Sequence, residues 1–154
     1  MRVDAVPASL ALAQAASESG WGTSRFASLG NSLFGQWTWG KGLKPAEQRA
    51  GTHGDHRIAA FDTTGEAAYA YALNLNTQGA YRDLRLKRAD LRRHNQRISG
   101  SVLAETLLKY SERGQAYVDD LKALIRQNRL DDADDAYLRD MAVIRIVPAE
   151  APPK

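Results

Sequence analysis

The sequence contains no cysteine. This absence excludes a disulfide framework, a thiolate nucleophile and a cysteine-ligated zinc site. Its apolar runs are far shorter than the roughly 18 residues that a membrane-spanning helix needs, so we expect no transmembrane segment. A strong charge of one sign is also missing, because 21 Lys and Arg residues stand against 18 Asp and Glu residues. With 154 residues, 44% of them hydrophobic and 25% charged, the chain is predicted to form one globular domain.

The small positive excess lies entirely in the second half of the chain. Residues 1–77 carry six basic and six acidic side chains, whereas residues 78–154 carry fifteen and twelve. Seven of these basic residues fall between Arg82 and Arg97. A solvated helix face accounts for such a stretch, and a surface for an anionic polymer is the alternative. No nucleic-acid-binding motif accompanies it, so nucleic acid is not an expected partner.

The first third of the chain predicts one helix followed by loops. Residues 9–15 superficially resemble the apolar part of a secretion signal, but Asp4 and Pro7 favour the start of a folded helix instead. This alanine-rich helix is expected from about Pro7 to Glu18, with Gly20 ending it, and should be central. Residues 20–54 are rich in glycine and aromatics, which predicts loops with one hairpin before a strand at residues 57–61.

The remainder of the chain is predicted to be mainly helical. Thr63 and Glu66 have the spacing of a capping box and open a helix at residues 67–75. Further helices are expected at residues 102–110 and, from the clearest amphipathic pattern, at residues 117–125. An acidic turn at residues 131–135 and a short strand at residues 143–147 precede the proline-rich tail. The predicted class is mainly α (α+β).

Glu18 is the candidate for acid–base chemistry. A carboxylate that closes a buried helix is disfavoured in its charged form by desolvation and by the partial negative charge of the helix C-terminus. Both effects raise its pKa, and a carboxylic acid that stays protonated near neutral pH can serve as a general acid. An ordinary surface glutamate in the last helical turn is the alternative.

Aromatic residues follow Glu18 closely, at Trp21, Phe26, Phe34, Trp37 and Trp39. Indole rings in a glycine-rich loop suit stacking against sugar rings, although they also suit an ordinary core. We expect Trp21 to fold back against the core beside Glu18. Trp37 or Trp39, together with later tyrosines, is expected to line a sugar-binding groove.

Other catalytic templates are missing from the sequence. It has no Gly-x-Ser-x-Gly, no phosphate-binding loop, no dinucleotide fingerprint and no His-Glu-x-x-His. His53, Asp55 and His56 form a conceivable set of metal ligands, but histidines in a glycine-bounded loop are more often solvated. We therefore expect neither a metal nor a cofactor.

A resemblance to a known family is carried by one long segment. Residues 7–37 read PASLALAQAASESGWGTSRFASLGNSLFGQW. This segment resembles the opening of the peptidoglycan N-acetylglucosaminidase domain of glycoside hydrolase family 73, especially its Bax-like branch. The family marks its general acid with an ALAQAA-x-ES-GWG pattern followed by an N-x-LFG turn, and both are present here. Residues 74–82 and 110–117 resemble later segments, so the resemblance covers about residues 5–130.

The resemblance implies a fold and a set of site residues. The fold would be lysozyme-like and helical with a small flexible β-hairpin lobe, residues 1–130 forming the catalytic domain and residues 131–154 an extension packed on it or trailing from it. Glu18 would be the general acid. The second acidic residue would be Glu47, with Asp55 as its rival. Tyr110 and Tyr117 match the family's late tyrosine-containing segment and would be further catalytic residues. The expected substrate contacts are Asn31, Phe34, Trp37, Trp39 and Tyr81.

The implied activity is hydrolysis of the N-acetylglucosaminyl β-1,4 bond of murein by an endo-β-N-acetylglucosaminidase. The alternatives are a glycan-binding module without activity, and a muramidase or lytic transglycosylase that acts on the neighbouring bond. Two carboxylates ~5 Å apart would favour a retaining mechanism, and a separation of ~6.5 to 9.5 Å would favour an inverting one. A greater separation would indicate that the substrate's own acetamido group takes the place of the second carboxylate. The expected partner is the peptidoglycan glycan strand. The expected state is a monomer in the bacterial cell envelope, at the periplasm or cell surface, with any targeting segment outside this chain.

Overall fold

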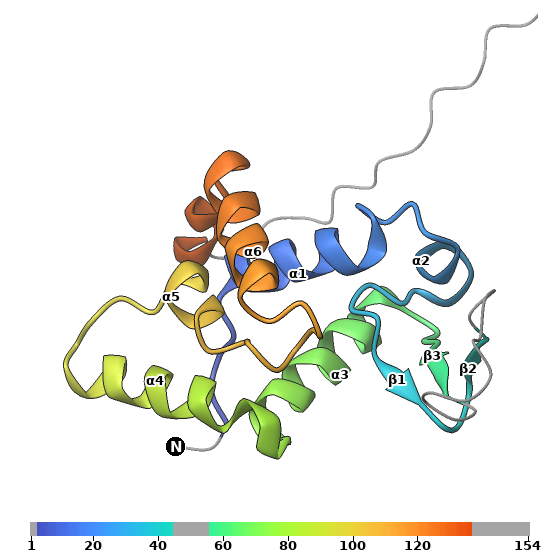
Figure 1. The fold of residues 1–154 in the computed structure, drawn as a ribbon, viewed down its shortest axis with the longest axis horizontal. Coiled ribbons are helices and arrows are strands. Elements are labelled where there is room, and N and C mark those ends of the chain that lie inside the picture. Colours follow the sequence, from blue (N-terminus) through green and yellow to red (C-terminus); the bar gives the residue numbers. More distant parts are fainter. Residues whose placement is uncertain (1–2, 45–55, 137–154) are drawn as a thin grey trace, which may run out of the picture.

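The computed structural model describes residues 3–44 and 56–136. Helices make up the body of the molecule, and three short strands lie together at one end (Figure 1). The elements in chain order are α1 (Ala8–Ser19), α2 (Arg25–Gly30), β1 (Trp37–Thr38), β2 (Gly42–Leu43), β3 (Arg57–Ala59), α3 (Thr64–Thr77), η1 (Gly79–Tyr81), α4 (Arg82–Arg93), α5 (Gly100–Ala104), α6 (Gln115–Gln127) and η2 (Leu130–Asp135). This confirms the mainly α (α+β) class and the lysozyme-like pairing of a helical body with a small β lobe.

Helix α1 runs through the centre of the helical body, as its alanine-rich sequence predicted. Leu10 and Ala13 are fully buried, because small side chains let neighbouring helices approach on several faces. Pro7 lies at the N-cap. Gly20 ends the helix in the left-handed conformation, with φ 58° and ψ 51°, and its N–H bonds to the Ala16 carbonyl.

The segment between α1 and α3 contains more structure than its sequence predicted. Helix α2 was missed, although Ser24 caps it by accepting a hydrogen bond from the Ala27 N–H. The strand expected at residues 57–61 is β3, which ends at Ala59, but the hairpin expected before it is not formed by β1 and β2, because both of them pair with β3 instead of with each other. The sheet order is therefore β1-β3-β2, and both pairings are antiparallel.

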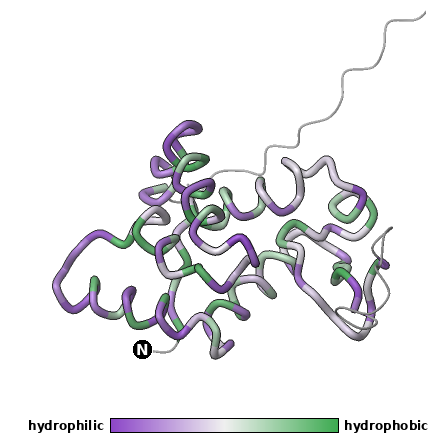
Figure 2. The backbone as a smooth tube through the Cα atoms, viewed as in Figure 1, coloured by the Kyte–Doolittle hydropathy of each residue, from purple (hydrophilic) through white to green (hydrophobic). Residues whose placement is uncertain are grey.

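Helices α3 and α4 are anchored by polar side chains at their ends and sides. The expected capping box is present at α3, because the Thr63 hydroxyl accepts from the Glu66 N–H and the Glu66 carboxylate accepts from the Asp62 N–H. Hydrophilic residues predominate along α4 (Figure 2). Arg88 of α4 is nevertheless 1% exposed. Five of the seven basic residues between Arg82 and Arg97 are exposed, as a solvated helix face predicts, and Arg88 is the buried exception.

Arg88 is buried because its guanidinium satisfies polar groups of the chain's N-terminal segment and of α3. It donates to the carbonyls of Asp4 and Ala5 at 3.1 and 2.9 Å and to Asn76 Oδ1 at 2.6 Å. Asp4 also forms an ion pair with Arg92 at 2.6 Å. These contacts fasten the segment before α1 to α3 and α4.

The last part of the domain packs on α1. Helix α5 ends at Ala104, well before the predicted residue 110, whereas α6 confirms the amphipathic helix. The acidic turn forms η2, in which Asp134 accepts hydrogen bonds from the Ser9 N–H at 2.8 Å and the Ser9 hydroxyl at 2.7 Å. The strand expected at residues 143–147 lies outside the described residues. Separately, none of the helices in the described ranges is long and apolar enough to span a membrane.

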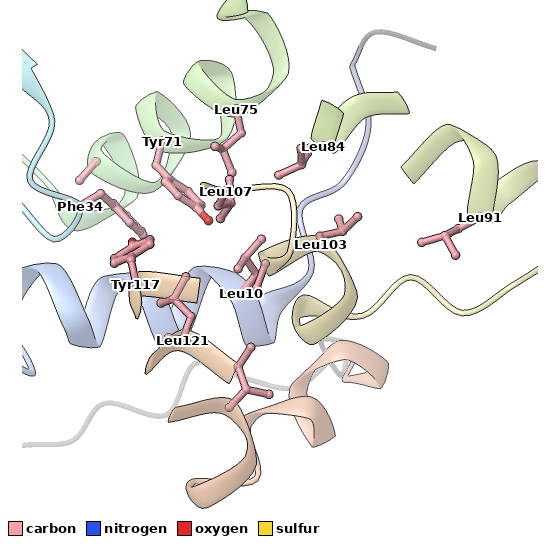
Figure 3. Close-up of a cluster of buried hydrophobic side chains, with 14 residues drawn as sticks. Leu10, Phe34, Tyr71, Leu75, Leu84, Leu91, Leu103, Leu107, Tyr117 and Leu121 are labelled. Atoms are coloured by element: carbon pink, nitrogen blue, oxygen red, sulfur yellow. The ribbon is translucent and has the colours of Figure 1, made fainter. Parts of the chain in front are cut away.

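The hydrophobic core joins α1, α3, α4, α5 and α6. Leucines from these helices surround Leu10, and Tyr71 and Tyr117 lie at the side of the core that faces Phe34 (Figure 3). The rings of Phe34 and Tyr71 stack with centroids 4.1 Å apart. The core thus ends in an aromatic cluster, and the candidate site is built against that cluster.

Candidate active site

An open cavity of about 1040 Å³ lies at the end of α1. Four parts of the chain line it: the last turn of α1, the segment that leads into β1, the end of α3 with η1, and the loop between α5 and α6. The lining residues are Glu18, Phe34, Gly35, Gln36, Trp37, Asn74, Tyr81, Leu108, Lys109, Tyr110, Ser111, Glu112 and Arg113. The space is of the size expected for a small-molecule or oligosaccharide site.

Glu18 is half-buried at the cavity wall. Burial raises the pKa of its carboxyl above the ordinary value of 4.5, and this direction agrees with the sequence-based expectation. A hydrogen bond from the Tyr117 hydroxyl and the nearby charge of Arg113 act in the opposite direction on the same pKa, but more weakly. Glu18 is therefore a carboxylic acid whose neutral form is favoured and which remains accessible from the cavity.

Gly35 brings the segment before β1 close to Glu18. Its φ is 59°, a left-handed conformation that favours glycine. A Cβ atom at this position would lie 3.2 Å from Glu18 Oε2. The glycine of the LFG turn is therefore needed for two reasons, the backbone angle and the space beside the carboxylate.

Three tyrosines stand beside Glu18 and come from different elements. The rings of Tyr110 and Tyr117 stack with centroids 5.6 Å apart, and Tyr81 packs on Tyr110 at 5.8 Å. The Tyr110 hydroxyl donates to the Phe34 carbonyl at 3.2 Å. Burial raises the pKa of all three hydroxyls, which therefore stay neutral hydrogen-bond donors at physiological pH.

The structure brings several predicted site residues together. Glu18, Phe34, Trp37, Tyr81 and Tyr110 line the cavity. Tyr117 is 2% exposed and lies behind the wall, where it reaches the Glu18 carboxylate. Trp37 is half exposed and stacks on His56 with ring centroids 4.2 Å apart. Its indole is therefore presented at the edge of the cavity.

Other predicted site residues lie elsewhere. The Asn31 side chain donates to the carbonyls of Phe61 and Asp62, so it joins α2 to the segment before α3 rather than lining the cavity. Trp39 is 75% exposed in the turn after β1 and is not part of the cavity wall.

Trp21 contradicts the expectation that it packs against the core. It is 61% exposed. The reason is the backbone, because Gly20, Trp21 and Gly22 all have positive φ and this turn directs the indole outward.

The second carboxylate expected from the sequence is not placed by the structure. Glu47 and Asp55 lie outside the described residues, as does His53. Among the described residues, Glu112 is the other carboxylate on the cavity wall. No group of three or more His, Asp or Glu side chains in the described ranges could hold a metal ion.

Sequence reasoning missed several residues of the site. Gln36, Asn74, Lys109 and Arg113 line the cavity, and Gln14 lies behind it, bonded to Tyr117. Gln14 carried a detectable signal, because a lone glutamine in an alanine-rich helix expected to be central must find hydrogen-bond partners in the core. The others sit in segments whose position depends on tertiary contacts.

Comparison with known proteins gives two matches. A family model described as mannosyl-glycoprotein endo-beta-N-acetylglucosaminidase (Glucosaminidase) matches residues 1–130. Protein bax of Escherichia coli (strain K12) is 35% identical over 131 residues, which are 83% of this chain and 45% of that protein. The chain thus spans less than half the length of this relative. No solved structure matches the chain.

Proposed function

The chain belongs to the Glucosaminidase family of glycoside hydrolases, and from this premise we propose that it hydrolyses the N-acetylglucosaminyl β-1,4 bonds of peptidoglycan glycan strands. The family confirms the resemblance found in the sequence and the class of the enzyme. The bond, the polymer and the catalytic role of Glu18 are the parts that we propose.

The observation that carries the proposal is the environment of Glu18. Its raised pKa means that the carboxyl group keeps its proton to a higher pH than an ordinary glutamate does. The group borders an open cavity with aromatic walls, which matches what sugar rings bind. A protonated acid beside a sugar-binding groove can deliver its proton to a glycosidic oxygen.

The reaction would begin when a glycan strand lies in the cavity with its scissile oxygen at Glu18. The exposed indole of Trp37 would stack on a sugar ring and hold the strand. Glu18 would protonate the leaving oxygen as the glycosidic bond breaks, while positive charge develops on the sugar. A carboxylate on the other side would stabilise that charge or activate water, and we assign this role to Glu47, with Asp55 as the rival.

Digestion of purified murein with mass analysis of the new reducing ends tests the proposal. We expect ends that carry N-acetylglucosamine and a loss of about 10²-fold or more in turnover for Glu18→Gln, since the amide has no transferable proton. Glu105→Gln, which changes an exposed glutamate paired with Lys122, is the matched control and should digest normally. Reducing ends that carry N-acetylmuramic acid would instead show a muramidase, and ends that carry its anhydro form would show a lytic transglycosylase. Binding of murein without any products would show a glycan-binding module.

The same assay identifies the second carboxylate. Glu47→Gln, Asp55→Asn and Glu112→Gln are compared, and we expect Glu47→Gln to lose the most activity. Full activity in all three would mean that the substrate's acetamido group supplies the second function.

The proposed substrate also determines where the protein would act. Peptidoglycan lies outside the cytoplasmic membrane, so we propose that the chain works in the cell envelope.

We further propose that it acts as a monomer, because Glu18 and the cavity residues all come from one chain. Sedimentation of the active protein tests the oligomeric state.

A further inference from the structure

A buried row of hydrogen bonds leads from the core to Glu18. Gln14 of α1 is 0% exposed and Tyr71 of α3 is 2% exposed. The Tyr71 hydroxyl donates to Gln14 Oε1 at 2.7 Å, and Gln14 Nε2 donates to the Tyr117 hydroxyl at 2.9 Å. Tyr117 in turn lies beside the Glu18 carboxyl and lowers its pKa as a hydrogen-bond donor. Three side chains behind the cavity wall therefore form one path that ends at the candidate acid.

The donors in this row all point toward Glu18. A hydroxyl has one proton, so Tyr117 can donate to Glu18 only if its oxygen receives its other hydrogen bond from a donor. The NH₂ group of Gln14 supplies that donor. If the amide were reversed, its carbonyl would take the Tyr117 proton, and the buried Tyr71 hydroxyl would lose the acceptor that it has in the structure. Tyr71 therefore fixes the orientation of Gln14, and Gln14 fixes the direction of the Tyr117 hydroxyl.

We propose that Gln14 is a positioning residue that orients Tyr117 as a donor to one oxygen of Glu18, so that the transferable proton of Glu18 resides on its other oxygen, facing the cavity. This inference rests on the proposed role of Glu18 as the general acid. A neutral carboxyl group has one carbonyl oxygen and one hydroxyl oxygen. The oxygen that accepts from Tyr117 is the carbonyl, because a proton there would collide with the tyrosine proton. The three side chains Tyr71, Gln14 and Tyr117 thus determine which oxygen of Glu18 carries the transferable proton, and they take no part in the proton transfer itself.

Several other groups act on the same carboxyl and must be held constant in a test. Arg113, in the turn before α6, lowers the pKa of Glu18 by its charge. Tyr81 and Tyr110 interact electrostatically with Glu18 from η1 and from the loop before α6. Lys109 and Glu112 line the same cavity. None of these side chains shares a hydrogen bond with Gln14 or Tyr71 in the described structure, so substitutions at those two positions remove none of their hydrogen bonds.

The test is the titration of the Glu18 carboxyl by carbon-13 NMR in the intact chain. Tyr117→Phe removes the donor to the ionised carboxylate, so the titration midpoint should rise. Gln14→Met should also raise it, because a hydroxyl that no longer accepts a hydrogen bond is a weaker and less oriented donor. Tyr71→Phe removes only one buried hydroxyl and releases the amide to turn, so it should raise the midpoint in the same direction. If Gln14→Met fails to fold, Tyr71→Phe gives the same information.

Double variants separate positioning from general damage. Since Gln14 is proposed to act through Tyr117, Gln14→Met combined with Tyr117→Phe should titrate like Tyr117→Phe alone. Turnover of Gln14→Met should fall by less than the roughly 10²-fold loss expected for Glu18→Gln, with the alkaline limb of its pH profile moved upward. Asn76→Leu is the control for loss of a buried amide, because Asn76 bonds Arg88 away from the site, and it should leave the titration unchanged.

Each outcome decides one of the two proposals. An unchanged midpoint in Gln14→Met and Tyr71→Phe, or shifts that simply add to that of Tyr117→Phe, would overturn the positioning role while leaving the general acid intact. A Glu18→Gln variant that digests murein at the normal rate would overturn the proposed function, and this result does not depend on the titration.

Discussion

Glu18 shows at the scale of a single residue how function and stability oppose each other. The burial that raises its pKa disfavours its charged form, so the folded protein holds the proton more tightly than the unfolded chain does. At a pH above both pKa values the carboxylate is charged in both states and is partly desolvated in the fold. The wild-type residue should therefore reduce the free energy of unfolding at neutral pH.

We predict that Glu18→Gln is more stable than the wild type at pH 7 and equally stable in acid. Below the unfolded-state pKa, near 4.5, Glu18 is neutral in both states, so a neutral amide changes little. As the pH rises through the raised folded-state pKa, the wild type loses stability that the variant keeps. Thermal melts of both proteins between pH 3 and 8 measure the difference, which should grow with pH.

Glu105→Gln serves as the control in these melts, because Glu105 is exposed and its ion pair with Lys122 lies at the surface, where such pairs contribute little to stability. A Glu18→Gln variant that is less stable at pH 7 than in acid, relative to the wild type, would show that Tyr117 and Arg113 stabilise the carboxylate by more than burial costs it.

The sequence predicted some residues of the site and not others, for identifiable reasons. The raised pKa of Glu18 and the stop at Gly20 follow from local features of one helix, and both predictions are confirmed. The direction of the Trp21 side chain depends on three consecutive positive φ values, and the partners of Asn31 lie thirty residues away. Neither the direction of the Trp21 side chain nor the partners of Asn31 can be predicted from the residue types nearby in the sequence.

At the scale of elements, the site depends on the contact between the last turn of α1 and the turn before β1. Gly35 permits this contact, because its positive φ turns the chain and its missing side chain leaves room for Glu18 Oε2. The segment after Gly35 then carries Gln36 and Trp37 along the cavity. One glycine thus sets the distance between the acid and a wall of the groove.

We predict that Gly35→Ala lowers turnover more than its effect on stability explains. The added Cβ would push the Glu18 carboxyl by a few tenths of an ångström, and misplacement of a catalytic group by about 1 Å can cost about 10²-fold in rate. The left-handed backbone would add a stability loss of about 1 kcal/mol. Murein digestion and thermal melts of the same preparation measure the two effects.

Gly22→Ala provides the comparison, since Gly22 has a φ of 78° but a Cβ there would meet no atom within 4 Å. It should lose similar stability and keep its turnover. Equal activity loss in the two variants would assign the effect to backbone strain and not to the contact with Glu18.

Elements with a strong local signal were predicted well, and short ones were not. The amphipathic pattern of α6 and the capping box of α3 identified both helices. Helix α2 has six residues and α5 has five, too few to show a helical period. The burial of Arg88 could not be foreseen either, because its partners belong to the N-terminal segment and to α3.

At the scale of the whole molecule, Asp134 joins the two ends of the described chain. Helix α1 has no side-chain cap of its own, since Pro7 stands at its N-cap. Asp134 takes over this role from a distance by accepting from the Ser9 N–H in the first turn of α1, and it also accepts from the Gly100 N–H at the start of α5 at 3.2 Å. One carboxylate therefore satisfies the N-terminal donors of two helices, where the partial positive charge of each helix favours it.

This arrangement bears on the extent of the domain. The family match ends at residue 130, four residues before Asp134, and the sequence predicted an extension from residue 131. In the structure, η2 continues to Asp135, which pairs with Arg97 at 2.6 Å. We propose on this basis that the stable folding unit includes η2, beyond residue 130, and that the catalytic unit proposed above requires it.

The last prediction is that Asp134→Ala lowers the free energy of unfolding by about 1 to 3 kcal/mol, because the fully buried Ser9 hydroxyl and two helix N–H groups lose their acceptor. A chain shortened to residue 130 should lose at least as much, although it keeps every residue of the family match. Denaturant titrations measure both losses. Asp132→Ala is the control, because Asp132 pairs only at the surface with Arg129 and its removal should cost less than about 1 kcal/mol. A shortened chain as stable as the full one would place the end of the folding unit at residue 130 and make the η2 contacts dispensable.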